Sequence, residues 1–110
     1  MDTEMIAMQM IASAGDGKAL AFEALEEARN GNFEKALTLV KESEKASLEA
    51  HHAQTNLLVS QAKGDKLEVD VLLIHAQDHL MTSILAQELI SEMVKMYIKM
   101  HEFETKLGGK

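Results

Sequence analysis

The sequence contains no cysteine, no proline and no tryptophan, and it has a single tyrosine. Without cysteine there are no disulfides, thiolate metal sites or thiol nucleophiles, so any chemistry depends on other side chains. Proline is the strongest helix breaker, and strands are enriched in aromatic residues, which are scarce here. Because Ala, Leu, Met, Glu and Lys are abundant instead, the composition predicts an all-α fold.

Basic residues are outnumbered as well: 11 Lys and Arg face 18 Asp and Glu, a formal charge of −7. That balance disfavours binding to nucleic-acid phosphates or to anionic lipid. No apolar run approaches the roughly 20 residues of a membrane-spanning helix, and the acidic N-terminus lacks the basic start of a secretion signal. We therefore expect an intracellular protein with no nucleic-acid partner and no membrane insertion.

Two breaks divide the chain into three long helical segments. Gly31 can end a helix, Asn32 can cap the next one, and Gly64 marks the second break. Short connections favour antiparallel neighbours, so residues 1–110 should form one domain, an up-down-up antiparallel three-helix bundle with a frayed tail from Leu107. The predicted helices cover about residues 3–30, 33–63 and 69–106.

Gly15 and Gly17 lie inside the first predicted helix. Each costs on the order of 1 kcal/mol relative to Ala in a helix interior. They indicate either a local break or a close approach of another chain element, and the sequence does not decide between these.

The third predicted helix is apolar on two sides. One stripe at helical spacing satisfies a bundle core, comprising Leu73, Ala76, Leu80 and Ile84. A second stripe comprises Val71, Ile74, Asp78, Met81, Leu85, Leu89, Met93 and Met96. It predicts either a wide core face or a subunit interface with Asp78 in its middle.

A polar group interrupts this helix. His75, Asp78, His79 and Thr82 occupy positions i, i+3, i+4 and i+7 and therefore share one side. Folding the second helix back antiparallel places residues 51 and 52 opposite residues 81 and 82. We therefore expect four of the five histidines at one level of the bundle, with His52 and His101 as ordinary polar residues.

Two chemistries fit this group. His75 and His79, one turn apart, are a possible metal pair with Asp78 or His51 completing the shell. Alternatively, a neutral imidazole is a nucleophile near neutral pH, and the phosphoramidate it forms can pass its phosphoryl group onward. No Walker-type Gly-rich loop is present, so a nucleotide donor is not expected.

The segment 71–83, VLLIHAQDHLMTS, strongly resembles the signature of the lactose/cellobiose/chitobiose IIA family of the sugar phosphotransferase system. The resemblance continues through LAQELI at 85–90, EAHHAQTNLL at 49–58 and SAGDGKALAFEALEEARNGNFEKA at 13–36. It covers nearly the whole chain in order.

This resemblance implies a role for each motif residue. His75 is expected to take a phosphoryl group from phospho-HPr and give it to a Cys of a cognate IIB component. Asp78 is expected on the three-fold axis of a homotrimer, where three copies share a divalent cation, magnesium. Supporting roles are expected for His79, Gln77 and His51; Gln77 points away from His75 in its own helix and would contribute from an adjacent subunit or by supporting other site residues. Thr82 is a supporting candidate on chemical grounds, as a neighbouring hydrogen-bond donor.

The resemblance also implies a cytoplasmic phosphotransferase component that serves disaccharide uptake without touching the sugar. The residues of HLMTS and LAQELI weakly favour the chitobiose/cellobiose branch of the family. A different class remains open: a non-enzymatic helical module that binds a metal through its His and Asp residues, or one that acts only as a regulatory partner. Stoichiometric zinc without phosphorylation would favour the metal-binding module.

Overall fold

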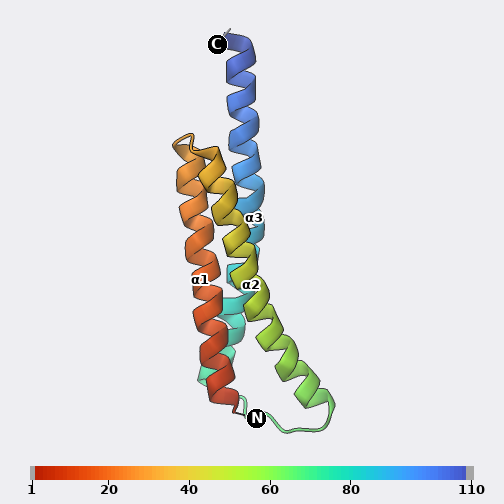
Figure 1. Cartoon of the computed structure of the whole chain (residues 1–110). Helices are drawn as coiled ribbons and strands as arrows, with labels where there is room; N and C mark the ends of the chain where they lie inside the picture. Colours follow the sequence, from red (N-terminus) through yellow and green to blue (C-terminus); the bar gives the residue numbers. More distant parts are fainter. Residues whose placement is uncertain (1, 109–110) are drawn as a thin grey trace.

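The computed structural model describes residues 2–108, and these residues form three helices and no strand. They are α1 (Thr3–Arg29), α2 (Phe33–Ala62) and α3 (Val71–Gly108). Figure 1 shows them running up, down and up, so the chain is the predicted antiparallel three-helix bundle. Its long axis is 64 Å against 19 and 18 Å across. No helix among the described residues is both long and apolar enough to cross a membrane.

Both connections between helices depend on a glycine that adopts a left-handed conformation. Gly31 has φ +87° and Gly64 has φ +103°, values that strain any residue with a side chain. At the first turn the backbone amide of Asn32 donates to the carbonyl of Glu27. At the second turn the backbone amide of Asp65 donates to the carbonyl of Ser60. These six-to-one bonds satisfy carbonyls at the ends of α1 and α2, so both predicted breaks are confirmed.

The helix starts differ from the prediction at two places. Asn32 makes no side-chain cap for α2, because its side-chain amide nitrogen Nδ2 donates to Glu27 Oε1 at 2.8 Å instead. Asp70 accepts a hydrogen bond from the amide of Leu73 at 2.9 Å, so the predicted start at residue 69 is two residues early. The tail expected to fray from Leu107 is helical through Gly108, and residues 109–110 lie outside the described part.

Two hydrophobic clusters form the core. One lies near the α2–α3 connection and includes Met10, Leu57 and Leu80, and the other lies near the α1–α2 turn and includes Ile90 and Val94. Alanines fill most of the buried positions of α1, which lets this helix approach both neighbours closely. The buried positions between the two clusters are small or polar: Gly17, Ser43, Ser47, Ser83 and Gln87.

α1 is continuous through both of its internal glycines, so the local break considered above does not occur. Gly17 is the point of close approach: a Cβ there would lie 2.9 Å from Ser47 Oγ and 3.3 Å from its backbone nitrogen. The hydroxyl of Ser43 donates to the Gly17 carbonyl at 2.6 Å. A side chain at position 17 would therefore push α1 and α2 apart.

The two stripes of α3 have different environments. Leu73, Ala76 and Leu80 are buried, as predicted for the core stripe, and Ile84 packs against them. Every apolar member of the second stripe is exposed, from Val71 at 83% to Met93 at 41%. The interpretation of the second stripe as a wide core face is therefore wrong for the single chain.

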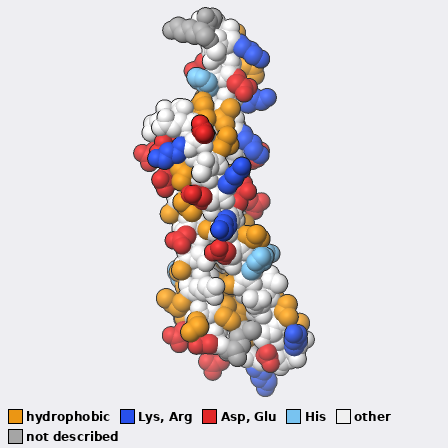
Figure 2. Space-filling view, viewed as in Figure 1, with side chains coloured by type: hydrophobic (Ala, Val, Ile, Leu, Met, Phe, Trp, Pro, Cys, Tyr) orange, Lys and Arg blue, Asp and Glu red, His pale blue; other side chains and the backbone are white. Residues whose placement is uncertain are grey.

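α3 continues past the α1–α2 turn as a projecting helix (Figure 1). Its exposed apolar side chains continue there with Met100, Phe103 and Leu107. On the face drawn in Figure 2, by contrast, hydrophobic side chains are interspersed with acidic and basic ones. Among the described residues, most of the exposed large apolar side chains belong to α3.

Candidate functional site

His75 and His79 form a stacked pair on α3. Their ring centroids are 5.9 Å apart and the ring planes differ by 5°. The i, i+4 spacing places both rings on one side of the helix. His75 is exposed to solvent, whereas His79 is partly buried. The pair therefore combines an accessible imidazole with one that is held against the bundle.

The partly buried ring lies against α1. Nε2 of His79 is 3.4 Å from the position that a Cβ on Gly15 would take. Neither ring forms a side-chain hydrogen bond with another described residue, so stacking and packing set their positions. An offset parallel stack at this distance is a favourable arrangement of two rings.

Gln77 faces the other neighbour, α2. Its Oε1 accepts a hydrogen bond from Nε2 of Gln54 at 2.6 Å. Gln77 therefore points away from His75, as expected for a residue two positions along a helix. Gln54 was not among the predicted site residues, although the antiparallel register places it within two residues of its observed partner. This bond ties the motif segment of α3 to α2.

Thr82 directs its hydroxyl towards its own helix. Oγ1 donates to the carbonyl of Asp78 at 2.9 Å and lies 3.3 Å from the carbonyl of His79. The hydroxyl is thus used by the backbone and is not aimed at the imidazole of His75. Asp78 is exposed in the second stripe, between the exposed side chains of Ile74 and Met81.

The Gln54–Gln77 bond places residues 51 and 52 at the level of the stacked pair, as predicted, but among the described residues these histidines do not join the pair in a group that could hold a metal. His51 and His52 are both exposed on α2, and His52 lines a groove with Ile6 and Gln9 of α1. The carbonyl of His51 accepts a bond from Thr55. The fifth histidine lies in another part of the bundle, where His101 packs against Phe33 with ring centroids 5.3 Å apart. Among the described histidines, His75 and His79 are the two whose rings stack, whereas the rotation of α2 turns His52 towards a groove beside α1.

Within residues 2–108, no three side chains among His, Cys, Asp and Glu are arranged to hold a metal ion. The metal pair with Asp78 or His51 as a third ligand is therefore not formed by one chain. A cation shared by Asp78 of three chains concerns an assembly, and that remains a prediction. Asp78 fits such a site chemically, since carboxylate oxygens are the ligands magnesium prefers.

The geometry suits nucleophilic chemistry at an imidazole. A neutral imidazole nitrogen carries a lone pair near neutral pH, and an exposed ring lets a second protein bring an electrophile close. The fold and the pair thus define a helical protein with an accessible histidine that is stacked on a second, partly buried one.

Comparison with known proteins gives this arrangement a family. Residues 5–98 match the model of the PTS system, Lactose/Cellobiose specific IIA subunit. The N,N′-diacetylchitobiose-specific EIIA component of Escherichia coli is 40% identical over 99 residues, which cover 90% of this chain and 85% of the relative. The chain belongs to the lactose/cellobiose/chitobiose-specific IIA family and is a phosphocarrier component of the sugar phosphotransferase system.

Solved structures agree with this membership. The cellobiose-specific enzyme IIA from Bacillus anthracis matches with a TM-score of 0.89 and 41% identity, covering 93% of this chain and 94% of that one. A solution structure of the IIA(Chitobiose)–HPr complex of the Escherichia coli phosphotransferase system matches with a TM-score of 0.75 and 37% identity. That match covers 92% of this chain and 98% of the other.

Proposed function

We propose that His75 accepts a phosphoryl group from phospho-HPr and passes it to a cysteine of a cognate IIB component during disaccharide uptake. The observation that carries the proposal is the exposed imidazole of His75, stacked at 5.9 Å on the partly buried His79, in a chain of the IIA family. The relative from Escherichia coli forms a complex with HPr, which supports HPr as the donor.

The transfer needs little from the protein beyond positioning. A lone pair on a nitrogen of His75 attacks the phosphorus of phospho-HPr, a new P–N bond forms, and the P–N bond to the donor histidine breaks. In the second step the thiolate of IIB attacks the same phosphorus, and the electrons of the breaking bond return to the imidazole of His75. The stack on His79 restricts how the nucleophilic ring can turn.

Both partners must approach the same nitrogen. HPr and IIB therefore use overlapping surfaces around His75, and they cannot bind at the same time. Sugar never approaches this site, because the group that is transferred is a phosphoryl group between proteins. A cytoplasmic location follows from these partners. A stable ternary complex of the chain with HPr and IIB would contradict the proposal.

Phosphorylation by phosphoenolpyruvate, enzyme I and HPr tests the assignment. We expect one acid-labile, base-stable phosphoryl group per chain in the mass spectrum, and we expect His75→Ala to abolish it. His52→Ala, an exposed histidine on the groove between α1 and α2, is the matched control and should accept phosphate like the wild type. Phosphate that persists on His75→Ala would refute the assignment.

His79→Ala separates positioning from acceptance. The variant should keep its helix content and still accept phosphate, at a rate lowered by about tenfold or more because His75 loses its stacking partner. Wild-type transfer rates would show that the stack has no role. If the purified protein instead carried stoichiometric zinc and phospho-HPr did not phosphorylate it, the metal-binding module would be favoured.

We further propose that the chain assembles as a homotrimer through the second stripe of α3. The stripe leaves seven large apolar side chains between 41% and 83% exposed, from Val71 to Met96, and water contact at all of them is unfavourable. Asp78 lies among them, and three copies around an axis would hold three carboxylates that a magnesium ion can share. In such a trimer, contacts between chains would bury the face that the single chain leaves exposed.

A further inference from the structure

Gly15 is the glycine whose presence the bundle core does not explain. It lies inside the continuous helix α1, where a glycine costs on the order of 1 kcal/mol relative to Ala. Gly17 has a packing reason, because Ser47 of α2 leaves no room for a Cβ. Gly15 is only partly buried, and no side chain of α2 approaches the position where its Cβ would lie.

What approaches Gly15 is the imidazole of His79. Outside the glycine's own stretch of helix, Nε2 of this ring is the one heavy atom of the described residues within 4 Å of the added Cβ, at 3.4 Å. A methyl group fits at that distance as a tight contact, whereas a γ carbon would extend towards the space of the ring. A side chain larger than a methyl group at position 15 would therefore compete with the ring of His79 for space.

Resting on the phosphoryl-acceptor role proposed for His75, we propose that Gly15 is a positioning residue of this site. α1 supports the ring of His79 at Gly15, and the ring of His79 supports the ring of His75 by stacking. α1 thereby sets the direction in which the nucleophilic ring faces its partner proteins. Gly15 touches no reacting atom and acts only through His79.

Two substitutions at position 15 test this chain of contacts. Gly15→Val places γ carbons against the ring, and we expect phosphoryl transfer from phospho-HPr to slow by about 10-fold to 100-fold, as misplaced reacting groups do. Gly15→Ala should slow transfer far less. Both replacements have a higher helix propensity than glycine, so circular dichroism should show no loss of helix. Ala12→Val, at an exposed position one turn earlier in α1, is the matched control and should transfer at the wild-type rate.

A double-mutant cycle with His79→Ala distinguishes positioning from a general structural effect. If Gly15 acts through His79, Gly15→Val should cause no further slowing once the imidazole is gone. Equal slowing in both backgrounds would overturn the proposal, and so would a Gly15→Val protein that transfers at the wild-type rate.

Nuclear magnetic resonance gives a second test, which does not depend on phosphoryl transfer. Nuclear Overhauser contacts between the Gly15 α protons and the ring protons of His79 should be present in the wild type. In Gly15→Val the ring resonances of His79 and His75 should both shift, whereas Ala12→Val should leave them in place. Unmoved rings in Gly15→Val would overturn the positioning role. If the wild type accepted no phosphate, the proposed function would fail, while this spectrum would still decide the role of Gly15.

Discussion

Single hydroxyl groups in the middle of the bundle differ in how well they are satisfied. Ser43 Oγ donates to the Gly17 carbonyl at 2.6 Å in a fully buried place. Ser47 and Ser83 are also buried, and their hydroxyl oxygens have no hydrogen-bond partner among the described residues. A buried hydroxyl without a partner loses its bonds to water and gains nothing in return.

Alanine replacements of two of these serines should therefore have opposite effects. Ser43→Ala should lower the free energy of unfolding by about 1 kcal/mol, because it removes a buried hydrogen bond. Ser83→Ala removes an unsatisfied group of the same size and should be neutral or stabilising by up to about 1 kcal/mol. Urea unfolding at equal protomer concentration measures both changes. Equal destabilisation by the two variants would show that the hydroxyl of Ser83 is satisfied in solution.

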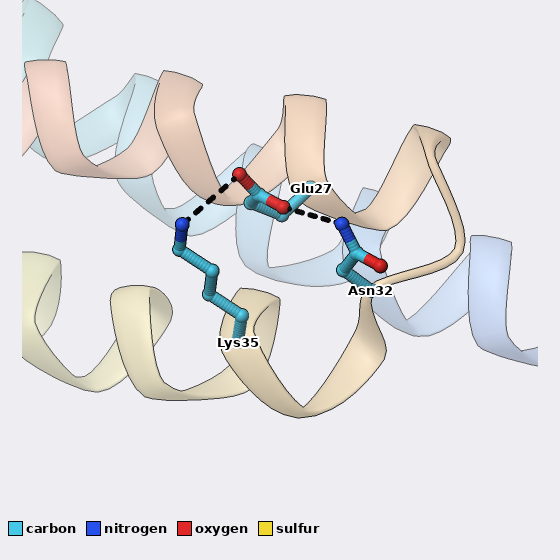
Figure 3. Close-up of polar contacts among 3 residues, drawn as sticks. All are labelled: Glu27, Asn32 and Lys35. Carbon is cyan, nitrogen blue, oxygen red and sulfur yellow. Dashed lines mark hydrogen bonds and ion pairs between the residues drawn. The ribbon is translucent and has the colours of Figure 1, made fainter.

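At the scale of the elements, the α1–α2 turn carries a small polar network (Figure 3). The carboxylate of Glu27 accepts a hydrogen bond from Asn32 at 2.8 Å and pairs with Lys35 at 3.4 Å. The hydrogen bond from Asn32 chiefly, aided by the charge of Lys35, lowers the pKa of Glu27 below its usual value of 4.5. The network connects the end of α1 to the start of α2.

The lowered pKa gives a pH dependence with a definite sign. The unfolded chain binds the proton of Glu27 more tightly than the folded one, so this contribution to stability is complete above the ordinary value of 4.5. It is lost as the pH falls through the lowered value. Glu27→Gln should therefore melt below the wild type near neutral pH, and the difference should disappear in acid. Thermal melts from about pH 3 to 7 measure it, and a difference that grows in acid would contradict the assignment.

The whole molecule presents one face that a single chain does not bury. We expect sedimentation equilibrium to find a trimer, and we expect Met96→Glu, at a position 61% exposed in the single chain, to weaken it without loss of helix. Met8→Glu on α1, 53% exposed and outside the stripe, is the matched control and should remain trimeric. A monomeric wild type would refute the proposed interface.

Asp78 should make the trimer depend on a cation. Three carboxylates at one axis repel one another and lose hydration, and magnesium offsets both effects. Asp78→Leu continues the apolar stripe, so the variant should stay trimeric and its melting temperature should no longer respond to chelator or added magnesium. Melts of both proteins with each additive provide the measurement. Dissociation of Asp78→Leu would show that the residue is not on a trimer axis.

Most of the architecture could be predicted because it depends on local chemistry. Glycines that adopt positive φ end α1 and α2 where Gly31 and Gly64 stand in the chain, and the apolar periodicity of α3 indicates its buried side. The pairing of His75 with His79 follows from the geometry of one helix. These features need no knowledge of how one helix faces another.

Contacts between helices were harder to predict from the sequence alone. Their partners depend on the rotation of each helix about its axis, and a rotation of a fraction of a turn exchanges one neighbour for another at little cost in local propensity. That rotation turns His52 to a groove beside α1, joins Gln77 to Gln54, and sets His79 against Gly15. Periodicity specifies which face of a helix is apolar, whereas only packing of all three helices brings a particular imidazole to a particular glycine.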